Sequence, residues 1–181
     1  MDRNGFKDIE NFELAYKERL YEYNFINKKS SVGECRILLM HLGGIVLECY
    51  IKSIIINENK IVKSKNNKFW YNEDRVNCIE QTAQNMRKIE MKNATKKNPG
   101  HSIREAICSI GVLDEILSDR TDIELHINRI QMPFGDEREF IDLRYSNVED
   151  KDELEKIFSE WKESFIKLKK WIVETIDISE E

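Results

Sequence analysis

Residues 37–56, which read ILLMHLGGIVLECYIKSIII, form a run of twenty mostly apolar residues. Its length is that of a membrane-spanning helix, but Glu48 and Lys52 lie well inside it. A charged side chain near the centre of a bilayer is costly in free energy. We therefore predict that this run belongs to the buried central helix of a soluble helical protein, from about residue 32 to residue 56.

Two further features of this helix carry expectations about packing. Gly43 and Gly44 lie in its middle, where each lowers helix propensity by on the order of 1 kcal/mol relative to Ala. We expect a neighbouring helix to approach closely there. Glu48 and Lys52 are four residues apart with the acid first, which is the favoured order for an intrahelical ion pair. Their spacing alone indicates such a pair at a partly wet edge of the helix.

Helical spacing of apolar residues recurs along the chain and predicts helices over about 8–26 and 76–89. Ser102 and Glu105 match a capping box, which opens another helix. The clearest pattern is the last, where apolar residues step by three and four: Leu154, Ile157, Trp161, Phe165, Leu168 and Ile172. No segment alternates as a strand does. The predicted fold class is all-α, an antiparallel helical bundle of four to six helices.

Charge is distributed unevenly. The net charge is −5, yet eleven Lys and Arg residues face four Asp and Glu residues between Lys60 and Arg104. Within this basic stretch, Phe69, Trp70 and Tyr71 allow two interpretations: an RNA-contacting segment, or a solvated loop with one aromatic anchor. Four cysteines without a Cys-x-x-Cys pair predict neither a metal site nor a cofactor. With no signal peptide, we expect a cytoplasmic protein.

Three short motifs, in order, resemble those of the HEPN family, whose members are small helical bundles named for nucleotide binding. LECYIKSII, with Glu48 and Lys52, resembles the second helix of these domains. GHSIREAI, residues 100–107, resembles the turn that opens a later helix, and LRYSN, residues 143–147, resembles an Arg-Tyr pair ahead of the last helix. The resemblance implies one HEPN-like domain over residues 1–181, with residues 57–98 as a basic insertion between the second and third core helices.

The resemblance also bears on function. Many members resemble RNA-cleaving toxins that carry an Arg-x(4–6)-His motif at the start of the last helix. After Arg144, the corresponding positions hold Glu149, Asp150 and Lys151, so the histidine is missing. The expected function is that of a non-catalytic or degenerate member in a prokaryotic defence or toxin–antitoxin system. The expected ligand-binding residues are Glu48, Lys52, His101, Arg144 and Tyr145.

The resemblance implies a homodimer that binds a nucleotide, RNA or a protein partner such as a nucleotidyltransferase. Two alternatives stay open: a metal-independent RNase toxin, and a structural assembly subunit. Arg120 and His126 match the Arg-x(5)-His spacing and are the alternative catalytic pair. Arg36 and His41 also match the spacing, but they lie on the predicted central helix, where the family does not carry this motif.

Overall fold

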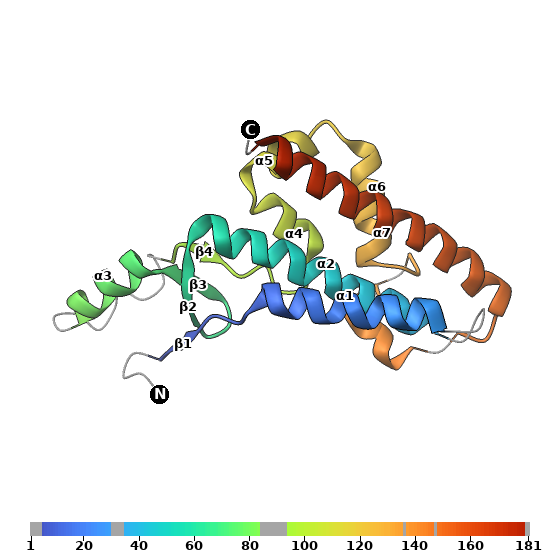
Figure 1. Cartoon of the computed structure of the whole chain (residues 1–181), viewed down its shortest axis with the longest axis horizontal. Coiled ribbons are helices and arrows are strands. Elements are labelled where there is room, and N and C mark those ends of the chain that lie inside the picture. Colours follow the sequence, from blue (N-terminus) through green and yellow to red (C-terminus); the bar gives the residue numbers. More distant parts are fainter. Residues whose placement is uncertain (1–4, 30–34, 84–93, 136, 147, 180–181) are drawn as a thin grey trace.

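A computed structural model describes residues 5–29, 35–83, 94–135, 137–146 and 148–179. Over these ranges the chain is mostly helical, about 70%, with a small four-stranded antiparallel sheet at one end (Figure 1). The helices are α1 (Phe12–Lys29), α2 (Arg36–Asn59), α3 (Glu73–Ala83), α4 (Ile103–Cys108), α5 (Gly111–Leu117), α6 (Thr121–Gln131), the 3₁₀ helix η1 (Phe140–Tyr145) and α7 (Lys151–Ser179). The strands are β1 (Phe6–Asp8), β2 (Ile61–Lys65), β3 (Phe69–Asn72) and β4 (Lys96–Lys97).

The apolar run forms α2, which is the central helix of the fold, as its sequence predicts. α1 packs along it in the opposite direction, and α4, α6, α7 and η1 contact its other sides (Figure 1). By length and composition α2 could cross a membrane, but 67% of its most apolar 18-residue segment is buried inside the protein. Core packing explains this hydropathy, which is therefore only weak evidence for a membrane span.

Both α2 glycines lie where aromatic side chains press against the helix backbone. A methyl group on Gly43 would lie 3.0 Å from Cζ2 of Trp161 on α7. A methyl group on Gly44 would lie 2.9 Å from the Cβ of Phe140 on η1 and closer still to its ring. The predicted close approach is therefore confirmed, and it comes from the aromatic side chains of two elements.

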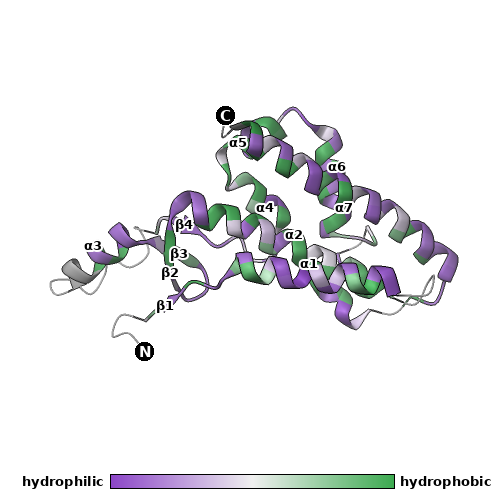
Figure 2. Cartoon of the chain, in the orientation of Figure 1, coloured by the Kyte–Doolittle hydropathy of each residue, from purple (hydrophilic) through white to green (hydrophobic). Residues whose placement is uncertain are grey.

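α7 has the amphipathic form that its sequence predicts. Hydrophobic and hydrophilic residues alternate along it (Figure 2), and Trp161, Phe165, Leu168 and Ile172 are buried in the main core. The capping box is also present, because the backbone N–H of Glu105 donates to Ser102 Oγ at 3.1 Å. The helix that it opens, α4, is only six residues long, and residues 109–110 separate it from α5.

The all-α prediction is wrong at the basic stretch, where β2, β3 and β4 form a sheet in the order β1-β2-β3-β4. The strands are only two to five residues long and are rich in lysine, so their alternation is weak. The missed signal is Asn66-Asn67. Both residues adopt left-handed backbone angles, with φ of 55° and 54°, which Asn tolerates better than most residues. At these two residues the chain reverses direction between β2 and β3.

The sheet is joined to the helical core through the N-terminal part of the chain. β1, from the N-terminus, pairs with β2, and Trp70 of β3 is buried against Phe12 of α1, with ring centroids 6.0 Å apart. Tyr71, the next residue, faces a second small core with Phe6 and α3. Residues 84–93, part of the stretch expected as an insertion and of the helix expected over 76–89, lie outside the described residues.

The contact at Gly44 yields a first prediction. Gly44→Ala should lower the free energy of unfolding by about 1–3 kcal/mol, because the new methyl group overpacks against Phe140. Urea denaturation followed by circular dichroism measures this loss. The matched control is Gly111→Ala at the start of α5, where an added methyl group meets nothing within 4 Å. Gly111→Ala should be as stable as the wild type or slightly more stable. A Gly44→Ala protein as stable as the wild type would show that Phe140 does not pack closely against Gly44.

Candidate functional site

Three of the expected ligand-binding residues meet in one network, in which Glu48 and Lys52 are buried and the His101 side chain is 54% exposed. Lys52 Nζ donates to Glu48 Oε1 at 2.7 Å, and His101 Nδ1 lies 2.9 Å from Glu48 Oε2. The predicted ion pair is therefore present, but it is buried and does not lie at a partly solvated edge of the helix, since Glu48 and Lys52 are only 7% and 4% exposed. The Lys52 ammonium also lies over the ring of Phe12, 5.1 Å from its centroid.

This network holds the start of α4 against the central helix. Both carboxylate oxygens of Glu48 are occupied, one by Lys52 and one by His101. Gln131, at the end of α6, accepts from the backbone N–H of Ile103 at 2.7 Å and donates to the carbonyl of His101 at 3.3 Å. Glu48 and Lys52 therefore have a structural role, because a buried charge is tolerated where it is paired and hydrogen-bonded.

The remaining two expected residues lie elsewhere. Arg144 lines a cavity of about 490 Å³ between the first turns of α2, the end of η1 and the first turn of α7. Tyr145, 81% exposed, packs its ring against the Arg144 guanidinium, 4.8 Å from Cζ to the ring centroid. None of Glu48, Lys52 and His101 lines this cavity. The five expected residues thus divide between a buried tie and an open, cationic cavity.

Positively charged and titratable side chains dominate the polar lining of the cavity. Arg36, Arg144 and Lys151 contribute to its wall together with His41, whereas the described lining residues include no Asp or Glu. Arg36 forms an ion pair with Glu155. Within the described part of the chain, neither Arg144 nor Lys151 has an acidic partner, so their charges remain available to an anion. Apolar side chains complete the wall: Ile37, Leu38, Leu143, Val148 and Leu154.

Two helix N-termini border the same cavity. α2 begins at Arg36, and its N-cap residue Cys35 makes no side-chain capping bond. α7 begins at Lys151, and its first N–H groups are already used, because those of Asp152 and Glu153 both donate to Asp150 Oδ1 at 3.0 Å. Helix N-termini favour anions through free N–H groups and the helix dipole. The N-terminus of α2 therefore adds to the positive potential of the cavity, and the N-terminus of α7 adds less.

His41 is held in a defined orientation in this wall. Its Nδ1 lies 2.9 Å from the carbonyl oxygen of Phe140, an acceptor, so in the neutral ring Nδ1 carries the proton and Nε2 is the acceptor. The structure thus places the Arg36–His41 pair beside Arg144, although the sequence interpretation gave the pair little weight. Its spacing was visible in the sequence, but the neighbouring Arg144 was not.

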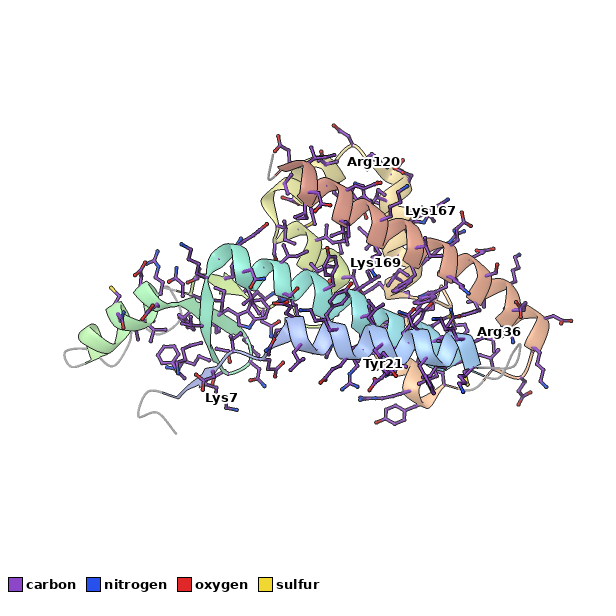
Figure 3. All side chains as sticks on the ribbon, in the orientation of Figure 1. Lys7, Tyr21, Arg36, Arg120, Lys167 and Lys169 are labelled. Atoms are coloured by element: carbon purple, nitrogen blue, oxygen red, sulfur yellow. The ribbon has the colours of Figure 1, made fainter. Side chains whose placement is uncertain are left out.

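Arg120 and His126 do not form a shared site. The Arg120 guanidinium makes two hydrogen bonds to the carboxylate of Asp122, at 2.8 and 2.7 Å. His126 is buried, and its Nδ1 lies 3.1 Å from Ser164 Oγ on α7. Burial, together with nearby Lys167 and Arg129, lowers the pKa of His126 below its usual value. Figure 3 shows Arg120 at the top of the molecule and Arg36 at its right-hand end.

In comparisons with known proteins, no family model, no curated protein and no solved structure matches this chain. Among the described residues, no three His, Cys, Asp or Glu side chains gather in a way that would hold a metal ion. The cavity is the candidate functional site because its wall gathers Arg36, Arg144 and Lys151.

The buried network yields a second prediction. Glu48→Gln should cost about 3 kcal/mol or more in the free energy of unfolding, since it leaves the Lys52 ammonium buried without a negative partner. The double variant Glu48→Leu, Lys52→Met should regain most of that loss, because an apolar pair needs no mutual neutralisation. Urea denaturation of both variants measures the difference. Unchanged stability of Glu48→Gln would show that the network is not a structural tie.

Proposed function

We propose that this chain is a HEPN-like protein of a prokaryotic defence or toxin–antitoxin system that binds a phosphate-bearing ligand, a nucleotide or RNA, in the cationic cavity. Four side chains suited to an anion, Arg36, His41, Arg144 and Lys151, line the same cavity of about 490 Å³. Support for the family comes from the three ordered sequence motifs. A nucleotidyltransferase encoded beside such a protein is the partner that the resemblance implies.

The chemistry of the wall suits phosphate. An arginine guanidinium matches two phosphate oxygens with a planar pair of N–H donors, and a lysine adds a mobile point charge. Arg144 and Lys151 supply these groups without a competing acid in the described chain. The volume is within the range of small-molecule sites. Tyr145, exposed beside Arg144, offers an aromatic face on which a base can stack.

A second function has its own supporting observation, the orientation of His41. The Phe140 carbonyl fixes its tautomer and leaves Nε2 as a base in a wall that also holds two arginines. A base and a cation beside a phosphodiester are the groups that metal-independent RNA cleavage at the ribose 2′-hydroxyl requires. Cleavage would thus use His41. The Arg120–His126 pair is less suited, because Arg120 is bonded to Asp122 and His126 to Ser164.

Binding is tested by fluorescence anisotropy with a labelled single-stranded RNA of mixed sequence, and by competition with ATP and with inorganic phosphate. Arg144→Ala should weaken RNA binding by roughly tenfold, the loss expected for one hydrogen bond to a charged group. The salt dependence of the affinity should also become shallower, because one phosphate contact disappears. ATP competition without RNA preference would identify a nucleotide site, and RNA preference would identify an RNA site.

Two controls make the binding result specific. Arg120→Ala removes one positive charge at a distant surface position and should leave RNA affinity unchanged. The stable double variant Glu48→Leu, Lys52→Met should also bind as the wild type does. Binding that survives Arg144→Ala but is lost when Lys60, Lys63, Lys65 and Lys68 are neutralised would place the ligand on the sheet. No binding of any probe would favour a structural assembly subunit.

Cleavage is tested separately by incubating the purified protein with RNA in the presence of EDTA. If the protein cleaves RNA, His41→Gln should abolish the cleavage and retain binding, because glutamine keeps a polar side chain but provides no base near neutral pH. His126→Gln is the matched control and should keep full activity. Loss of cleavage in His126→Gln alone would return the catalytic role to the Arg120–His126 pair.

A further inference from the structure

A second groove lies between α1 and α7, apart from the cationic cavity. It has a volume of about 540 Å³, and none of its described lining residues lines the cationic cavity. Lys162 of α7 contacts Asn27 of α1 at one end of the groove. Lys169 lies over the ring of Tyr16 at the other end, so the two helices run antiparallel. Along α7 the lining runs from Lys162 to Glu174, about 18 Å at 1.5 Å per residue, and we call this elongated site the α1–α7 groove.

The floor of the α1–α7 groove is apolar. Tyr23 and Phe165, both buried, pack against each other there with ring centroids 5.1 Å apart. Leu20 and Val173 extend the apolar wall toward one end, and Ile166, 57% exposed, lies between the two ends. A groove of this volume, mostly apolar with a few polar groups, is typical of small-molecule sites. Its length favours an extended alkyl chain, whose binding also covers the exposed part of Ile166.

The opposite end of the α1–α7 groove is polar and positively charged. Lys162 Nζ donates to Asn27 Oδ1 at 3.3 Å and lies 5.9 Å from the centroid of the Phe158 ring. Within the described residues Lys162 forms no ion pair, and the amide nitrogen of Asn27 has no partner, so both groups can donate to an anion. Lys28 and Lys29, the last two residues of α1, are exposed and add positive charge beside Asn27.

The Tyr23 hydroxyl is the polar group of the floor. Tyr23 is only 4% exposed, and its Oη has no hydrogen-bond partner among the residues that the structure describes. Trp161 Nε1 is the one fully buried side-chain polar atom without a partner in the described chain, so the Tyr23 hydroxyl must reach the groove. Burial raises the pKa of this phenol to about 12, so the hydroxyl stays protonated near neutral pH. It is therefore a hydrogen-bond donor available to a ligand oxygen.

We infer that the α1–α7 groove binds a long-chain fatty acid, whose carboxylate lies at Lys162 and Asn27 and whose alkyl chain extends along the floor toward Val173. Tyr23 lies four residues before Asn27, on the same side of α1, and its hydroxyl supplies a further donor. The described lining includes no arginine, the residue whose planar donors best match phosphate, so a singly charged carboxylate fits better than a phosphate head group. This ligand is separate from the phosphate-bearing ligand proposed for the cationic cavity.

The lysines at the other end of the α1–α7 groove are engaged elsewhere. Lys169 places its ammonium over the ring of Tyr16, 5.6 Å from the centroid, and Tyr16 is not among the described lining residues. Lys170 Nζ lies 3.5 Å from Glu174 Oε1, so its charge has a partner. Lys162, in contrast, contacts a residue of the groove itself. The carboxylate of the ligand therefore belongs at the Lys162 end.

Isothermal titration calorimetry with dodecanoate, kept below its critical micelle concentration at neutral pH, tests the inference. We expect saturable binding of one molecule per chain. Octanoate should bind more weakly by roughly tenfold or more, because its shorter chain buries fewer methylene groups. Dodecyltrimethylammonium has the same chain length with a cationic head group and should also bind more weakly by roughly tenfold or more, because the head group meets Lys162.

Variants of the lining test where the ligand lies. Lys162→Met keeps most of the side-chain stem without the charge and should weaken dodecanoate binding roughly tenfold, whereas Lys162→Arg should bind nearly as the wild type does. Tyr23→Phe removes only the hydroxyl and should weaken binding roughly fivefold. Ile166→Asn should weaken binding roughly tenfold, because the alkyl chain loses an apolar contact. Circular dichroism checks that each variant is folded.

Matched variants separate this site from general effects of charge and hydrophobicity. Lys167→Met and Lys169→Met, at two positions labelled in Figure 3, remove charges of α7 that do not hold the carboxylate and should bind dodecanoate as the wild type does. Leu125→Asn changes an exposed leucine of α6 and should also have no effect.

Three results would overturn the inference. The first is the absence of saturable dodecanoate binding, which would leave the α1–α7 groove to a protein segment. The second is binding that is lost in Lys169→Met and kept in Lys162→Met. The third is tighter binding of dodecylphosphocholine than of dodecanoate, which would assign the groove to a phospholipid.

Discussion

The central helix α2 packs so closely against its aromatic neighbours that its backbone is in contact with side chains of α7 and η1. Without side chains at Gly43 and Gly44, the backbone of the central helix admits Trp161 from α7 and Phe140 from η1. Phe140 then presents its carbonyl to His41, and η1 delivers Arg144 to the same end of α2. The cationic cavity is therefore a consequence of how two aromatic residues pack against two glycines.

Much of the helical framework could be predicted from the sequence, because long helices leave long periodic patterns. α2 and α7 were predicted from such patterns, and the Ser102–Glu105 cap from a local motif. The sheet could not be predicted in the same way, since its strands are two to five residues long and are interrupted by lysines. Asn66-Asn67 was its one local signal, and it marks a turn only when the flanking residues are already known to be strands.

The two candidate sites differ in how much of each was visible beforehand. The Glu48–Lys52 pair is local, so spacing alone predicted it, but His101 is 53 residues away and joins only in the folded chain. The cavity is more extreme, because Arg36 and His41 lie about a hundred residues before Arg144. Only the packing of η1 against α2 brings them together. The five residues that the sequence motifs suggest as one site therefore lie in two places. Glu48, Lys52 and His101 form the ion-pair network on α2, and Arg144 and Tyr145 lie at the cavity.

We propose that the cavity at the start of α2 holds phosphate. The most direct measurement is a titration of the isotopically labelled protein with ATP or a short RNA, followed by amide chemical-shift changes in NMR spectra. If phosphate binds in this cavity, the largest changes should fall on residues 36–41, on Arg144 and Tyr145 and on Lys151, with little change at Glu48 and His101. Changes confined to the lysine-rich strands, or to the region of Arg120 and His126, would contradict it.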